Sequence, residues 1–152
     1  MMTLKKTAGA GGVTTRAPAG KVPLLSKRLS VVDRNEWFLR FVSDVAQDQG
    51  YQVETYADPK DLLRDFDRFR PQVLLFDVVM PGIDGIELVR WLGAQDPAVS
   101  VIVCTSSSPI LSRAVVSLAE TLGLREVRLL GRPVSREVLR DTLSSVRPAG
   151  RR

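Results

Sequence analysis

Short apolar runs alternate with longer amphipathic segments from residue 29 to residue 146. The apolar runs have the length and composition of buried β-strands, and they lie at 29–33, 51–56, 73–76, 99–104 and 127–130. Between them apolar residues recur at helical spacing, which predicts helices at 35–49, 58–70, 86–92, 109–122 and 135–146. Gly50, Gly93 and Gly123 are expected to end three of these helices. Five strands that alternate with five helices predict a doubly wound parallel sheet with helices on both faces.

Polar side chains stand directly after four of the predicted strands. They are Asp33, Asp77, Thr105 and Arg132. Because the carboxyl ends of parallel strands share one edge of a sheet, we expect the four side chains to meet there. The set suits phosphoryl chemistry: carboxylates hold Mg²⁺, one carboxylate can act as the nucleophile, and a hydroxyl and a cation bind phosphate oxygens. Taken alone, Asp77 is as compatible with a structural role, as a turn residue or as the cap of the next helix, as it is with a functional one.

Composition removes several classes of function. The 152 residues are enough for one domain with a substantial core. The chain has no histidine, which excludes Ser-His-Asp triads, zinc sites with histidine ligands and a phosphohistidine in this chain. Its one cysteine, Cys104, lies in the apolar run VIVC and is expected to be a buried small hydrophobe. No stretch approaches the ~20 apolar residues of a membrane span, and no signal peptide is recognisable, so we expect a cytoplasmic protein.

Basic residues are concentrated at the two ends of the chain. The net charge is +5 overall, but residues 1–28 contribute +6 and residues 147–152 contribute +3, which leaves −4 on the body between them. Residues 1–28 are rich in Gly, Ala, Thr and Pro and are expected to be a disordered basic tail, with a second basic tail at 147–152. No aromatic residues are interleaved with these charges. We therefore expect solubilising tails rather than contacts with nucleic acid or membrane.

Four segments together resemble the receiver domain of two-component response regulators. They are VVD at 31–33, the run DVVMPGIDG at 77–85, VIVCT at 101–105 and GRP at 131–133. The resemblance covers about residues 29–146 and implies a flavodoxin-like sheet with strand order 2-1-3-4-5. It also implies that Asp77 accepts a phosphoryl group from a histidine kinase or phosphotransfer protein, and that Thr105 and Arg132 contact that group. By the same resemblance, Asp33, Asp77 and the backbone carbonyl of Val79 would hold Mg²⁺.

The sequence departs from the usual receiver pattern next to Asp33. Receivers usually have a second acid at the following position, and this chain has Arg34. Since Mg²⁺ prefers carboxylate ligands, this replacement predicts weakened Mg²⁺ binding. Arg34 is expected either to point to solvent or to pair with Asp77 in place of the metal. An additional oxygen ligand from Asn35 or Glu36 is the less favoured alternative.

Three further departures concern the transmission of the signal. Arg132 replaces the lysine that precedes proline in receivers, and the resemblance implies a cis Arg132–Pro133 bond. Leu129 occupies the position of the aromatic switch residue, so the usual coupling between threonine and that aromatic cannot operate. Val79 is apolar and should shield the approach of water, which predicts a long-lived phosphoaspartate.

These residues favour a single-domain response regulator that is phosphorylated on Asp77 and signals by protein contact rather than by enzymatic turnover. The face formed by the helix at 109–122, the strand at 127–130 and the helix at 135–146 is the expected docking surface for a downstream protein, and homodimerisation stays open. The alternative is a degenerate receiver that acts as an interaction module without phosphorylation. A flavodoxin-like nucleotide or flavin binder is disfavoured because no glycine-rich loop follows the first strand. Residues 105–133 are weakly similar to receivers that precede EAL-type phosphodiesterase domains, and no such output domain follows in this sequence.

Overall fold

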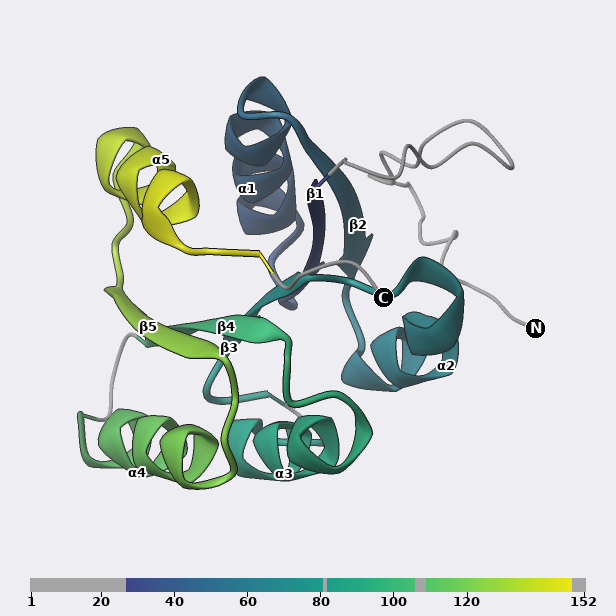
Figure 1. The fold of residues 1–152 in the computed structure, drawn as a ribbon. Helices are drawn as coiled ribbons and strands as arrows, with labels where there is room; N and C mark the ends of the chain where they lie inside the picture. The colour runs from purple at the N-terminus through teal and green to yellow at the C-terminus, as the bar shows by residue number, and fades with distance from the viewer. Residues whose placement is uncertain (1–26, 81, 106–108, 149–152) are drawn as a thin grey trace.

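The protein folds as a five-stranded parallel sheet between two layers of helices (Figure 1). The structure is a computed structural model and describes residues 27–80, 82–105 and 109–148. Its elements are β1 (Lys27–Val32), α1 (Glu36–Asp48), β2 (Tyr51–Tyr56), α2 (Pro59–Phe69), β3 (Val73–Asp77), α3 (Gly85–Gln95), β4 (Ser100–Thr105), α4 (Pro109–Thr121), β5 (Glu126–Gly131) and α5 (Arg136–Ser145). The strand order is β2-β1-β3-β4-β5, which confirms the expected flavodoxin-like arrangement.

The register of the sheet brings the strand ends to one edge, which we call the carboxyl edge. Asp77 at the end of β3 is paired with Cys104 of β4, and Thr105 at the end of β4 is paired with Gly131 of β5. All four strand pairs are parallel, so the carboxyl ends of β1, β3, β4 and β5 lie on the same side of the molecule. This parallel arrangement is the geometry that the sequence analysis assumed when it placed the polar residues after these strands at one edge.

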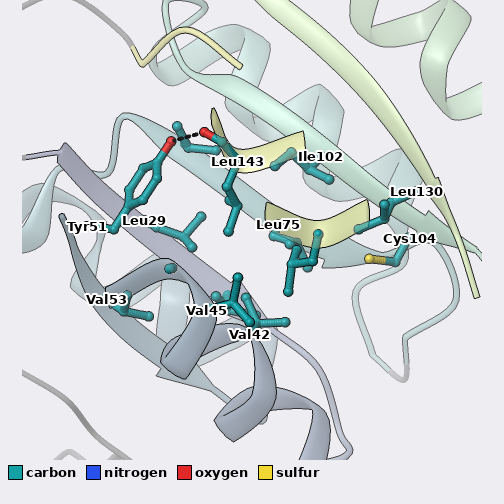
Figure 2. Close-up of a cluster of buried hydrophobic side chains, with 14 of the residues drawn as sticks. Leu29, Val42, Val45, Tyr51, Val53, Leu75, Ile102, Cys104, Leu130 and Leu143 are labelled. Atoms are coloured by element: carbon teal, nitrogen blue, oxygen red, sulfur yellow. Dashed lines mark hydrogen bonds between the residues drawn. The ribbon is translucent and has the colours of Figure 1, made fainter. Parts of the chain in front are cut away.

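Each face of the sheet carries its own apolar core. Helices α1 and α5 cover one face, where Leu29, Val42 and Leu143 are buried together and the hydroxyl of Tyr51 donates to the carbonyl oxygen of Leu143 at 3.0 Å (Figure 2). Helices α2, α3 and α4 cover the other face, and their buried side chains include Leu62, Phe66, Leu88, Leu92 and Val115. The strands that lie between are apolar on both faces, as expected of a parallel sheet.

The first strand begins earlier than the sequence pattern indicated. β1 starts at Lys27, two residues before the expected boundary, so Lys27 and Arg28 belong to the sheet and not to the basic tail. The ammonium group of Lys27 lies 4.5 Å from the centroid of the Tyr51 ring, and the backbone amide of Arg28 donates to Gln72. Arg147, assigned to the C-terminal tail, is held to the domain: its amide donates to Glu126 at 3.0 Å and its carbonyl accepts from the hydroxyl of Ser100 at 2.7 Å. Residues 1–26 and 149–152 of the predicted tails lie outside the described residues, as does Pro81.

Helix α3 is longer than the glycine pattern suggested. Gly93 was expected to end it, but the helix continues to Gln95. A Cβ atom at Gly93 would lie only 3.0 Å from Cδ1 and 3.1 Å from Cβ of Leu122, so this glycine allows the end of α4 to pack closely against α3. None of the five helices in the described part of the chain has the length and apolar character needed to cross a bilayer.

Candidate functional site

Four strand ends position the candidate site at the carboxyl edge. Asp33 follows β1 and is tied to the sheet by its backbone amide, which donates to the carbonyl of Tyr56 at 3.0 Å. Asp77 is the last residue of β3, and Arg132 follows β5 with its amide donating to the carbonyl of Thr105 at 2.8 Å. The structure therefore brings together the side chains of Asp33, Asp77 and Arg132, and Thr105 joins them through its backbone contact with Arg132. Within the described residues, no hydrogen bond joins the hydroxyl of Thr105 to Asp77.

One guanidinium group bridges the two acids of the site. Nη2 of Arg132 forms a short contact with Oδ2 of Asp33 and lies 3.0 Å from Oδ2 of Asp77. The side chains are only 18%, 7% and 18% exposed for Arg132, Asp33 and Asp77, so water screens these ion pairs weakly. The Arg132–Pro133 peptide bond is cis, as the resemblance implied.

Backbone amides hold the other oxygen of each carboxylate. The amide of Asn35 donates to Oδ1 of Asp33 at 2.8 Å, and the amide of Val79 donates to Oδ1 of Asp77 at 2.8 Å. Each acid thus accepts a hydrogen bond from the residue two positions later, which fixes the carboxylate at the start of its loop. Asp77 does not cap the following helix. Asp84 does so, in a capping box with Glu87 at the start of α3, so the alternative of Asp77 as a helix cap is wrong.

The guanidinium of Arg132 also has an aromatic support. Its central carbon lies 4.1 Å from the centroid of the Phe38 ring, in the first turn of α1. Burial by itself would lower the pKa of Arg132, but the carboxylates of Asp33 and Asp77 outweigh that effect and raise it. Arg132 is therefore a permanent cation between the two acids.

A match to a family of known proteins decides the identity of this arrangement. The model of the response regulator receiver domain matches residues 29–143, most of the described chain. The chain belongs to the response regulator receiver domain family.

Individual relatives agree with the family assignment. The chemotaxis protein CheY of Listeria monocytogenes is 25% identical over 80 residues, which are 52% of this chain and 67% of the relative. Among solved structures, the chemotaxis protein CheY4 of Vibrio cholerae is 27% identical with a TM-score of 0.66, over 80% of this chain and 99% of that one. The BeF3-activated receiver domain of DrrB is 26% identical with a TM-score of 0.63, over 79% of this chain and 96% of that one. The weaker similarity to receivers that precede EAL-type domains stays a prediction.

In this receiver Arg34 does not enter the acid pair. Arg34 is exposed, and within residues 27–80, 82–105 and 109–148 it forms no ion pair with Asp77. Of the two positions expected for Arg34, the structure supports the one that points to solvent. The side-chain oxygen of Asn35 caps α1 by accepting from the amide of Phe38 at 3.1 Å, so it is already occupied, and Glu36 is exposed. The arginine that pairs with Asp77 is Arg132.

Receivers generally bind Mg²⁺ at the phosphorylation site, and the donor set of this receiver can be compared with that requirement. A cavity of about 370 Å³ is lined by Asp33, Arg34, Asn35, Asp77, Val79 and Met80. Mg²⁺ requires an octahedral shell of oxygens at about 2.0–2.1 Å. Here Arg132 already contacts one oxygen of each carboxylate, backbone amides contact the other oxygens, and Arg34 replaces the third acid. As arranged, these residues do not fit a resident Mg²⁺ ion, and no group of three metal-ligating side chains occurs in the described residues.

Two side chains beside the site match what the sequence indicated. Cys104 is fully buried, and burial raises the pKa of its thiol to about 12, so it is an inert part of the core. Leu129 of β5, at the switch position, is 50% exposed and does not contribute an aromatic ring.

Phe38 is one of the apolar positions of the helix predicted at 35–49, and the sequence pattern did not indicate its role at the site. Phe38 is buried and supports Arg132 from 94 positions away in the chain. Its position could have indicated this contact. Phe38 lies in the first turn of the helix after Asp33, and α1 and the residues after β5 lie on the same face of the sheet. Periodicity alone gives no indication that a core ring also contacts a cation.

Proposed function

We propose that this receiver accepts a phosphoryl group on Asp77 from a histidine kinase or a phosphotransfer protein and passes the signal on through protein contacts. The observation that carries the proposal is the position of Asp77. Its carboxylate ends β3 at the mouth of a cavity, is fixed by the amide of Val79, and lies 3.0 Å from a cation. This is the arrangement of a nucleophilic carboxylate with a phosphate-binding group beside it.

The transfer step can be written from the residues of this chain. A carboxylate oxygen of Asp77 attacks phosphorus, a new phosphorus–oxygen bond forms, and the bond from phosphorus to the donor's imidazole nitrogen breaks with its electron pair leaving on the donor. Arg132 lies where its fork of N–H groups can contact the transferred oxygens, and its fixed positive charge stabilises the negative charge on the phosphoryl group. Thr105 at the end of β4 is the second group expected to contact those oxygens.

The surface formed by α4, β5 and α5 would bind the downstream protein that receives the signal. Large apolar side chains on these elements are exposed: Ile110 is 83%, Leu129 50% and Val138 50% exposed. These three side chains give the face apolar groups of the kind that a protein partner buries on binding. A downstream protein is therefore expected to bind there, and a homodimer is a further possibility for the same elements.

The degenerate receiver remains the second candidate, and one observation favours it. Arg132 already pairs with Asp77 and Asp33, so the nucleophile is occupied before any donor arrives. In that case the domain would serve as a constitutive interaction module.

Phosphorylation of the full chain by a small phosphodonor separates the two candidates. The protein is incubated with acetyl phosphate, with and without Mg²⁺, and its intact mass is measured. We expect one phosphoryl adduct that is lost in Asp77→Asn and kept in the matched control Asp84→Asn, whose side chain caps α3 in the same loop. If neither metal condition gives an adduct while the circular dichroism spectrum shows a folded domain, phosphorylation of this receiver is excluded and the interaction module is favoured.

A further inference from the structure

The charges around the site sum to zero. Asp33 and Asp77 contribute two negative charges, and Arg132 and Arg34 contribute two positive charges at the same edge of the sheet. A divalent cation is held in a site of this kind by an excess of negative charge. Neutralising the two acids therefore removes most of the attraction for such an ion.

We propose that the guanidinium of Arg132 is the resident cation of this receiver and takes the place of the divalent metal between Asp33 and Asp77. It contacts Oδ2 of both acids, which would otherwise repel each other in a poorly hydrated site. With the amides of Asn35 and Val79 on the two Oδ1 atoms, each of the four carboxylate oxygens has a donor. The acid pair is complete without a metal ion.

The surroundings of Arg132 hold it in this position. The ring of Phe38 lies 4.1 Å from the guanidinium carbon, and the backbone amide of Arg132 donates to the carbonyl of Thr105 at 2.8 Å, so both the side chain and its backbone are held. Asn35, Trp37, Phe38, Pro133 and Val134 line a cavity of about 500 Å³ together with Arg132. Arginine suits this role better than lysine because its planar guanidinium stacks on the ring of Phe38 while its Nη2 atom contacts both acids.

The proposal predicts that Mg²⁺ and Arg132 compete for the same two acids. It concerns the resting protein and does not depend on whether Asp77 is phosphorylated. Removing the guanidinium should expose two unpaired carboxylates, which destabilises the fold and creates affinity for Mg²⁺. The sequence interpretation attributed weakened Mg²⁺ binding to Arg34 alone, whereas the structure assigns the larger effect to Arg132.

Calorimetric titration of the full chain with Mg²⁺, paired with thermal unfolding at rising Mg²⁺, tests this assignment without a phosphodonor. We expect Arg132→Gln to bind Mg²⁺ at least about tenfold more tightly than the wild-type protein. We also expect Mg²⁺ to restore the lowered melting temperature of this variant while leaving that of the wild-type protein unchanged. The matched control is Arg136→Gln on α5, an exposed arginine that pairs with Asp48, which should behave as the wild-type protein.

Two results would overturn the proposal. One is saturable Mg²⁺ binding by the wild-type protein with the affinity of Arg132→Gln, and the other is no gain of affinity in that variant. Should Arg132→Gln fail to fold without metal, refolding by added Mg²⁺ supports the proposal, and failure to refold is checked with Arg132→Lys. The lysine variant keeps the charge but loses the planar group that stacks on Phe38, so a smaller gain in Mg²⁺ affinity supports the proposal and an unchanged affinity rejects it.

Discussion

The guanidinium of Arg132 lies over the ring of Phe38, with 4.1 Å between its central carbon and the ring centroid. Phe38 is 4% exposed and belongs to the core between α1 and the sheet. A cation at the edge of the site is thus in direct contact with the packing of the domain. Contacts of this kind are worth about 0.5–1 kcal/mol at exposed sites and about 2 kcal/mol when desolvated. The energetics of the site and of the core should therefore be coupled.

A double-mutant cycle measures this coupling. We expect Phe38→Leu and Arg132→Gln, combined and separate, to show a coupling of about 0.5–2 kcal/mol in the free energy of unfolding by urea. Leucine keeps most of the core volume, so the cycle reports the loss of the ring face rather than of the packing. The control cycle replaces Arg132→Gln by Arg136→Gln and should show additive effects. Additivity in the first cycle would mean that the ring does not stabilise the cation.

Gly85 sets the distance between helix α3 and the loop that follows Asp77. Its amide donates to the carbonyl of Val78 at 3.1 Å, and a Cβ atom there would lie 3.0 Å from that oxygen and 3.2 Å from Cα of the same residue. Both neighbours are backbone atoms next to the site, so they cannot yield by a change of rotamer.

We therefore expect Gly85→Ala to lower the free energy of unfolding by about 1–3 kcal/mol, as overpacking does. Gly131→Ala is the matched control, because a Cβ at that exposed position would meet nothing within 4 Å. It should change stability by less than about 0.5 kcal/mol. The free energy of unfolding is measured by chemical denaturation. Equal changes in the two variants would show that the backbone around Gly85 can accommodate a Cβ atom without loss of stability.

The acid Glu126 should make the stability of the domain depend on pH. Burial alone would raise the pKa of its carboxyl, but hydrogen bonds from the amide of Arg147 and the side chain of Arg128 outweigh burial and lower the pKa below the ordinary 4.5. A lowered folded-state pKa means that folding favours the carboxylate. Its contribution is complete above the unfolded-state pKa and is lost as the pH falls through the folded-state value.

The melting temperature of Glu126→Gln tests this pH dependence. At pH 7 it should lie a few degrees below that of the wild-type protein, and the difference should narrow as the pH falls below 4.5. Glu120→Gln on α4 is the control, since Glu120 is exposed and forms no ion pair among the described residues. If the difference in melting temperature between Glu126→Gln and the wild-type protein stays constant from pH 7 into the acid range, the lowered pKa of Glu126 is contradicted.

Periodicity predicted the strands and helices well because each element has one clear pattern. Val73–Asp77 reads as a buried strand with an acid at its end, and the structure has this strand at the centre of the sheet. Ends of elements depend on tertiary contacts that leave no local pattern. Gly93 has the local signature of a helix end, yet it lies inside α3 and allows the close approach of Leu122, the residue that follows α4. Lys27 joins β1 because β2 offers it a pairing partner in Tyr51.

The residues of the site were also predictable from the sequence, but the ion pairs between them were not. Spacing and strand order indicate that Asp33, Asp77 and Arg132 reach one edge of the sheet. They do not indicate which arginine pairs with the acids, because that depends on where a long side chain points once the neighbouring elements are packed. Arg34 is adjacent to Asp33 in sequence and points to solvent, whereas Arg132 is 99 positions away and forms the ion pair. Sequence distance is a poor guide to charge pairing in a doubly wound fold.

Val79 should control the lifetime of a phosphoryl group on Asp77. Its amide holds Asp77 while its side chain is 57% exposed at the mouth of the cavity that the acid lines. An apolar side chain there offers no hydrogen bond to a water molecule that approaches phosphorus. An amide side chain at the same position would bind and orient that water, as a water-positioning residue does in phosphoryl hydrolysis.

We expect Val79→Asn to lose the phosphoryl adduct several-fold faster than the wild-type protein, followed by intact mass after removal of acetyl phosphate. Val79→Leu keeps an apolar side chain over the cavity and should retain the slow rate. Neither substitution removes the backbone amide that holds Asp77, so the rate of adduct formation should change much less than the rate of its loss. Equal adduct lifetimes in the asparagine and leucine variants would mean that the polarity of this side chain does not govern the access of water to phosphorus. The lifetime would then be set by the size of the side chain at position 79 or by the contact of Arg132 with Asp77.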